Sequence, residues 1–119
     1  MAQDSSKPKD GVKFVKPSDR AFVGAEAMKI ARDVGPEISG TMACGIATFE
    51  PCDIPWTVQY DEYIYCLEGV LRLAIGDEEL VLETGCSVWL PKGTALAYRV
   101  SDWAKVVYTI YPGNWKAAS

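Results

Sequence analysis

Short segments rich in β-branched, aromatic and alternating apolar residues follow one another through most of the chain. Gly, Pro, Asp and Asn residues separate them at near-regular intervals, and little of the chain has the period of an amphipathic helix. Many short strands joined by turns are typical of an all-β barrel or sandwich, here one of about ten strands. The expected strands are residues 12–15, 27–34, 39–49, 58–67, 70–75, 79–82, 87–90, 94–100 and 105–111.

One segment near the N-terminus has features of both a helix and a strand. The Ala, Glu, Met and Lys content of residues 24–34 favours a helix. Met28 and Ile30, however, alternate with polar neighbours, which is the period of a strand. Because the rest of the pattern predicts a barrel, we expect a strand over 27–34.

Prolines and glycines set the expected connections between strands. Residues 50–55 contain two prolines, so we predict a loop there. Glu68 and Gly69 are expected to form a turn. That turn would make 70–75 the hairpin partner of 58–67.

Length and charge narrow the class of protein. The chain has 119 residues, which is the length of one domain, and a formal net charge of −4. Nucleic-acid binders usually present a basic stripe, so we expect no such partner. No segment approaches the roughly eighteen apolar residues of a membrane span, and the polar start of the chain is unlike a signal peptide. We therefore expect a cytoplasmic protein with no membrane partner, a disordered tail over 1–11 and one folded domain over 12–119.

The cysteines give no clear sign of a metal site or a redox centre. Four cysteines occur, at positions 44, 52, 66 and 86, and none forms a C-x-x-C pair. The favoured interpretation is buried free thiols in a reducing compartment. A disulfide or a zinc site built from converging thiolates remains open.

Two stretches have the spacing of a known barrel signature. Glu62 is followed by six residues and then Gly69, and Gly85 is followed by five residues and then P-x-G at Pro91 and Gly93. These stretches resemble the two motifs of the cupin superfamily. The resemblance implies a single-domain all-β fold, the RmlC-like jelly-roll barrel.

The cupin histidines are missing. Metal-binding members of the superfamily carry three, and this chain contains no histidine. Counting from Glu62 puts the first two positions at Trp56 and Val58, or one residue earlier with the longer spacing. Counting from Gly93 puts the third at Leu96. One carboxylate among such residues is a poor ligand set for a transition metal, so we expect no metal and no other cofactor.

A longer set of motifs resembles one branch of the superfamily. Pro-Trp-Thr at 55–57, Tyr-Asp-Glu at 60–62, Leu-Glu-Gly at 67–69, Pro-Lys-Gly at 91–93 and Pro-x-Asn-Trp at 112–115 are similar to the cupin domain of EutQ, the ethanolamine utilization family. That family also lacks the cupin histidines, and it generally carries an additional N-terminal region. The resemblance implies the same fold and pocket, with a pointer to amine or aldehyde catabolism.

The motif glutamate is the main candidate for chemistry. Side chains two apart on a strand share a face, and the cupin resemblance points that of Glu62 into the barrel. A carboxylate among apolar walls should have a raised pKa and suits general acid or base catalysis, so Glu62 and Tyr60 are the predicted catalytic residues. A purely structural role for Glu62, hydrogen-bonded to a tyrosine, remains open. Asn114 and Trp115 are expected to clasp the last strand. The predicted substrate-binding residues are Trp56, Val58, Cys66, Leu96 and Tyr98.

The sequence is compatible with three functions. The first is an enzyme that performs metal-independent isomerase-like or lyase-like chemistry on a small polar metabolite. The second is a module that only binds a small molecule, and the third is a structural accessory of a catabolic assembly. The family has been linked to kinase-like chemistry, but the sequence shows no Gly-rich phosphate loop. Tyr63, Tyr65 and Leu67 form an apolar outer face, which favours a homodimer.

Overall fold

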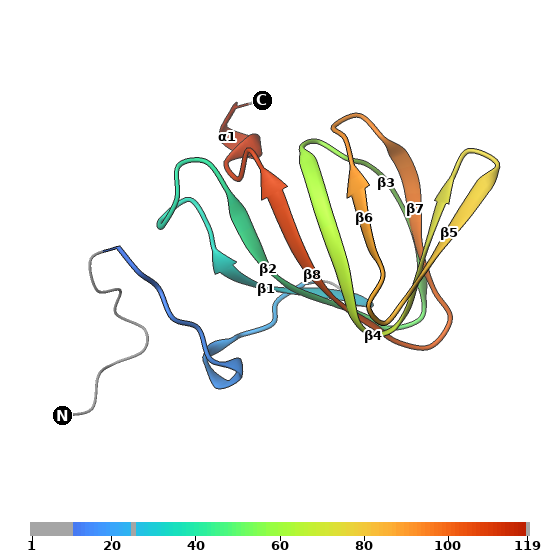
Figure 1. Ribbon diagram of the computed structural model, residues 1–119, viewed down its shortest axis with the longest axis horizontal. Coiled ribbons are helices and arrows are strands. Elements are labelled where there is room, and N and C mark those ends of the chain that lie inside the picture. The colour runs from blue at the N-terminus through green and yellow to red at the C-terminus, as the bar shows by residue number, and fades with distance from the viewer. Residues whose placement is uncertain (1–10, 25, 119) are drawn as a thin grey trace.

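One curled antiparallel sheet makes up almost the whole molecule (Figure 1). The computed structural model describes residues 11–24 and 26–118. The strand order is β1-β2-β8-β4-β7-β3, and β5 and β6 also pair with β4. The described residues therefore confirm the expected all-β barrel, with eight strands in place of about ten. Its elements are η1 (Pro17–Asp19), β1 (Met28–Val34), β2 (Ala43–Phe49), β3 (Cys52–Thr57), β4 (Asp61–Ile75), β5 (Glu78–Glu83), β6 (Ser87–Leu90), β7 (Ala95–Val100), β8 (Ala104–Tyr111) and α1 (Trp115–Ala118).

β4 is the strand that joins the two layers of the barrel. Its first half pairs with β8 and β6, and its second half pairs with β7 and β5. The predicted turn at Glu68 and Gly69 is wrong, because β4 continues through both residues with a bulge after Cys66. Gly69 has a φ of +71°, and a Cβ there would lie 2.0 Å from the carbonyl oxygen of Trp103. The glycine is required by this close approach between β4 and the start of β8.

The structure also bears on the expectations for residues 12–15, 27–34 and 50–55. The segment predicted as a connection is the strand β3, which tolerates Pro55 because it lies at the edge of the sheet and needs fewer backbone donors. Residues 12–15 form no strand. The strand chosen over a helix for 27–34 is confirmed as β1. The expected tail falls almost entirely on residues 1–10, which lie outside the described residues.

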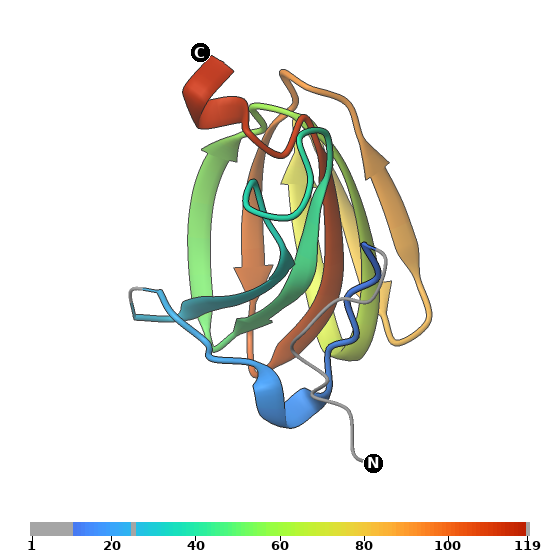
Figure 2. The ribbon, with the colours of Figure 1, turned by 90° about the vertical axis from the view of Figure 1, so that its left-hand side faces the viewer.

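The hydrophobic core follows the alternation of the strands. On β8, residues 104, 106, 108 and 110 are buried, and on β7 residues 96, 98 and 100 are buried. Glu62 and Ile64 of β4 face the same interior, while Tyr63 and Tyr65 are exposed on the outer face. Figure 2 shows α1 at one end of the barrel, near the end of β3. This arrangement leaves the inner face of the sheet to build both a core and a cavity.

All four cysteines are free in the structure. Cys66 is buried and Cys44 and Cys52 are half-buried, as expected for thiols within strands. Cys86 is exposed, because it follows the turn at Gly85 rather than lying on an inner face. Among the described residues, none of the helices has the length and apolar character needed to cross a membrane.

Candidate functional site

A cavity of about 520 Å³ lies inside the barrel. Residues of β1, β2, β3, β4, β7 and β8 line its walls, and the segment leading into α1 closes one side. Most of the lining is aliphatic or aromatic, with a small number of polar groups. A concave, mainly apolar cavity of this size with a few convergent polar groups is the usual form of a small-molecule site.

Glu62 is the buried carboxyl of the cavity. Its backbone pairs with Leu90 on β6 and Ile110 on β8, so its nearest neighbours across the sheet are apolar. The side chain is 6% exposed, and the hydroxyl of Tyr98 donates a hydrogen bond of 3.3 Å to its Oε1. Burial raises the pKa of Glu62 to about 7, and the hydrogen bond from Tyr98 opposes the rise only in part. Both protonation states are therefore populated near neutral pH, as a general acid or base requires.

Aromatic rings gather beside this carboxyl. The ring of Trp115 lies 5.2 Å from that of Tyr60 and 6.1 Å from that of Trp56, measured between centroids. Burial, and then the negative charge of Glu62, raise the pKa of Tyr60 to about 12. Tyr60 thus keeps its proton at physiological pH and can act as a hydrogen-bond donor. The three rings connect β3, the start of β4 and α1 into one wall.

The structure brings together four of the seven predicted site residues. Trp56, Tyr60, Glu62 and Tyr98 all line the cavity. The other three are buried in the hydrophobic core and are not among the residues that line the cavity: Val58, Cys66 and Leu96.

All three face the barrel interior, as strand alternation predicts, but they pack in the core beside the cavity. Val58 lies just beyond the end of β3, where its N–H donates to the carbonyl oxygen of Thr94 and its carbonyl oxygen accepts from the N–H of Gly93. Cys66 lies at the bulge of β4, and its thiol donates to the carbonyl oxygens of Glu68 and Gly69. Its side chain is buried on the same face of β4 as those of Glu62 and Ile64.

Several cavity residues were missed from the sequence. Trp115 and Asn114, expected only to clasp the last strand, line the cavity. Arg32 of β1 and Tyr108 of β8 also line it. Burial raises the pKa of Tyr108, while the nearby guanidinium of Arg32 opposes the rise. The alternation of β8 could have placed Tyr108 inside, because it lies two residues from Ile110 and shares its face.

The donor set does not fit the metal of the cupin fold. The positions where metal-binding cupins carry histidines hold Trp56, Val58 and Leu96, none of which is a metal ligand. Glu62 is the one carboxylate on the cavity wall. Across residues 11–24 and 26–118, His, Cys, Asp and Glu form no group of three that could hold a metal ion.

Comparisons with curated proteins point to one family. The acetate kinase EutQ of Salmonella typhimurium (strain LT2) is 30% identical over 114 residues, which are 92% of this chain and 50% of that protein. The acetate kinase EutQ of Clostridioides difficile (strain 630) is 30% identical over 79 residues, which are 66% of this chain and 50% of that protein. The chain therefore spans about half the length of these curated relatives.

Solved structures agree on the fold. A crystal structure of an ethanolamine utilization protein from Salmonella typhimurium LT2 superposes with a TM-score of 0.82 at 28% identity, covering 89% of this chain and 90% of that one. An RmlC-like cupin from Shewanella frigidimarina superposes with a TM-score of 0.74 at 12% identity, covering 85% and 91%. At that identity the likeness shows the cupin fold alone. The family model described as ethanolamine utilisation protein EutQ matches residues 5–117, and the chain belongs to the EutQ family of cupin proteins.

Proposed function

We propose that this EutQ-family cupin binds a small polar metabolite of amine or aldehyde catabolism and moves a proton on it without a metal ion. Glu62 is the proposed general acid or base, in isomerase-like or lyase-like chemistry. The observation that carries the proposal is a buried carboxyl in a ligand-sized cavity, with burial raising its pKa to about 7. Groups with such perturbed pKa values cluster at functional sites.

The neighbouring residues support this chemistry. When Glu62 is ionised, it can take a proton from the ligand, and the neutral carboxyl that results is the form that burial favours. In an isomerisation the same proton returns to a different ligand atom, so no net proton is gained or lost. Tyr60, which keeps its proton, can donate a hydrogen bond to an oxygen of the ligand. Trp56 and Trp115, with ring centroids 6.1 Å apart, give the cavity an apolar wall against which the body of a ligand can pack.

The name of the curated relatives raises a different activity, acetate kinase. Phosphoryl transfer depends on cations and metal ions that gather around the phosphate groups. The cavity of this chain holds two cationic side chains, Arg32 and Lys116, but its walls are mostly aromatic and aliphatic, and the sequence has no Gly-rich phosphate loop to accompany them. The relatives are also about twice as long as this chain. Proton transfer is therefore the activity that the cavity residues support better.

The alternative is a protein that binds a small molecule, or supports a catabolic assembly, without chemistry. One observation favours it: the hydrogen bond from Tyr98 already gives the Glu62 carboxyl a partner within the protein. A carboxyl satisfied in this way can persist for structural reasons alone.

The test is a Glu62→Gln variant, with Glu83→Gln as its matched control. Glu83 lies exposed on β5, away from the cavity. A panel of small keto, hydroxy and amino compounds is incubated in deuterated water, and proton exchange is followed by NMR. We expect the Gln variant at position 62 to keep its fold and lose activity or ligand affinity by at least about tenfold, or about 1.4 kcal/mol. Activity and affinity equal to those of the native protein would contradict the proposal.

A further inference from the structure

One buried hydroxyl in the cavity has no hydrogen bond of standard geometry to the described residues. Tyr108 of β8 is 6% exposed and lines the cavity, and its hydroxyl forms no hydrogen bond within the usual distance and angle limits, although the guanidinium of Arg32 lies near enough to oppose the rise in its pKa that burial causes. Buried polar groups are satisfied in most folded proteins, so an orphaned one needs an explanation. A hydroxyl that faces a cavity can be satisfied by a bound ligand.

A cation lies beside this hydroxyl. Gly45 of β2 pairs with Arg32 on β1 and with Tyr108 on β8, so the three residues form one row across the inner face. Gly45 has no side chain to separate the other two. A Cβ there would lie 2.2 Å from the carbonyl oxygen of Ala31, which shows how closely β1 approaches β2. The guanidinium of Arg32 therefore reaches the same part of the cavity as the hydroxyl of Tyr108.

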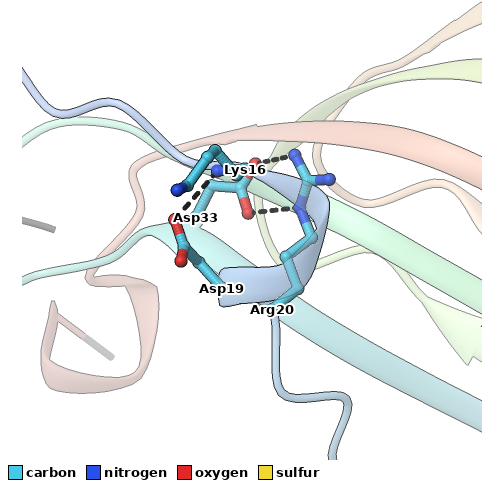
Figure 3. A network of polar contacts seen from close by, with 4 residues as sticks. All are labelled: Lys16, Asp19, Arg20 and Asp33. Carbon is cyan, nitrogen blue, oxygen red and sulfur yellow. Dashed lines mark hydrogen bonds and ion pairs between the residues drawn. The ribbon is translucent and has the colours of Figure 1, made fainter. Parts of the chain in front are cut away.

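The carboxylate nearest in sequence to Arg32, that of Asp33, already forms an ion pair with another arginine. Arg20 donates two hydrogen bonds to Asp33, at 2.9 and 2.8 Å, in the two-pronged geometry shown in Figure 3. Arg32 itself takes part in none of the ion pairs found among the described residues. Its charge thus remains available to an anion from outside the chain.

We propose that Arg32 and Tyr108 form a carboxylate-binding subsite of the cavity. The ligand class is a short carboxylic acid with a carbonyl or hydroxyl group a few bonds from the carboxylate and an otherwise apolar body. A guanidinium and a hydroxyl together match the two oxygens of a carboxylate. The apolar body fits the aromatic wall that includes Trp56 and Trp115. This inference rests on the proposed function, because it names the ligand of the same cavity.

The subsite is placed so that one ligand can reach both ends of the cavity. Glu62 pairs with Ile110, and Tyr108 lies two residues from Ile110 on the same strand. Glu62 and Tyr108 are therefore diagonal neighbours on adjacent strands, with Cα atoms on the order of 7–8 Å apart. A ligand whose carboxylate contacts Arg32 and Tyr108 can present its carbonyl or hydroxyl to Glu62 and Tyr98. Its own negative charge then lies away from that of Glu62.

The experiment measures binding of levulinate, a short keto acid, and of its neutral amide, levulinamide, by NMR titration. The native protein should bind levulinate at least about tenfold more tightly than levulinamide. Arg32→Met and Tyr108→Phe should each reduce this preference to below about threefold, because each removes one donor to the carboxylate. Arg99→Met is the matched control: it removes one positive charge from the outer face of β7, where Arg99 pairs with Asp53, and should keep the preference.

The outcomes separate this inference from the proposed function. Equal or undetectable binding of the two probes by the native protein would overturn the subsite. A full preference retained in folded Arg32→Met or Tyr108→Phe would overturn it as well. Tyr108→Phe keeps the ring in the core, so it tests the subsite even where Arg32→Met disturbs the fold. A preference that depends on both residues, found together with no Glu62-dependent proton exchange, would support the subsite and overturn the acid–base chemistry.

Discussion

Replacing Glu62 by Gln should remove a pH-dependent contribution to the free energy of unfolding. Burial raises the pKa of Glu62 from an ordinary value near 4.5 to about 7, so the folded state holds its proton more tightly than the unfolded chain does. The stability that this preference supplies is fully present below about pH 4.5, where the carboxyl is protonated in both states. It is lost as the pH rises toward and through about 7, where the folded carboxyl ionises.

The size of the effect follows from the two pKa values. Each pKa unit corresponds to about 1.4 kcal/mol, so a rise from 4.5 to about 7 amounts to about 3 kcal/mol. Gln at position 62 has no such proton equilibrium, keeps the shape of the side chain, and still accepts a hydrogen bond from Tyr98. Relative to the native protein, the variant should therefore gain about 3 kcal/mol of unfolding free energy between pH 4 and pH 9.

The assay is urea unfolding of both proteins, followed by tryptophan fluorescence at a series of pH values. The other carboxylates are common to both proteins, so their contributions cancel in the difference between the two free energies of unfolding. Glu83→Gln, which changes an exposed carboxylate on β5, should show little change in that difference. A difference for Glu62→Gln that stays constant across the whole range would refute the reasoning, because it would mean that the carboxyl titrates alike in both states.

Two further predictions concern the backbone and the outer face. Gly69→Ala should lower the free energy of unfolding, measured in urea, by about 3 kcal/mol or more, because a Cβ would lie 2.0 Å from a backbone carbonyl oxygen. Gly76→Ala is the control. Gly76 has a φ of +59° and open space around it, so this change should cost only about 1 kcal/mol. The chain should form a homodimer through the outer face where Tyr63 and Trp89, 41% and 59% exposed, pair across β4 and β6. Light scattering should give the dimer mass for the native protein and the monomer mass for Trp89→Glu, and a native monomer at micromolar concentration would contradict this.

Hydrophobic alternation was enough to predict most of the strands. The prediction failed where a proline or a glycine, which usually indicates a loop or a turn, lies within a strand. The prolines of residues 50–55 indicated a loop because proline cannot donate to a neighbouring strand. β3 is an edge strand, so the missing donor costs little there. Glu68 and Gly69 indicated a turn because glycine often supplies a positive φ at turns. Here the positive φ lies within β4, next to a bulge. A glycine is needed because the backbone of Trp103 comes very close to Gly69, and a contact between residues so far apart in the chain cannot be read from the local sequence.

Strand parity predicted which of these side chains face the interior, but not which of them line the cavity. Glu62 and Tyr98 lie inside well-paired segments, and both were correctly predicted to face inward. Val58 and Cys66 also face inward, but both pack in the core, because parity does not say where along the barrel the cavity lies. Trp115 could not be assigned from local pattern, because its place against Trp56 depends on how the end of the chain folds back over the barrel.

The position of Arg32 relative to Glu62 is the feature that makes both proposals compatible. The two residues line one cavity, yet β2 and β8 lie between their strands in the sheet, and no ion pair joins them within the described part of the chain. A direct pair would have favoured the ionised carboxylate and lowered the pKa of Glu62. It would also have neutralised the guanidinium that a ligand carboxylate needs. Because the strand order keeps the two charges apart, Glu62 remains able to exchange a proton near neutral pH and Arg32 remains able to bind an anion.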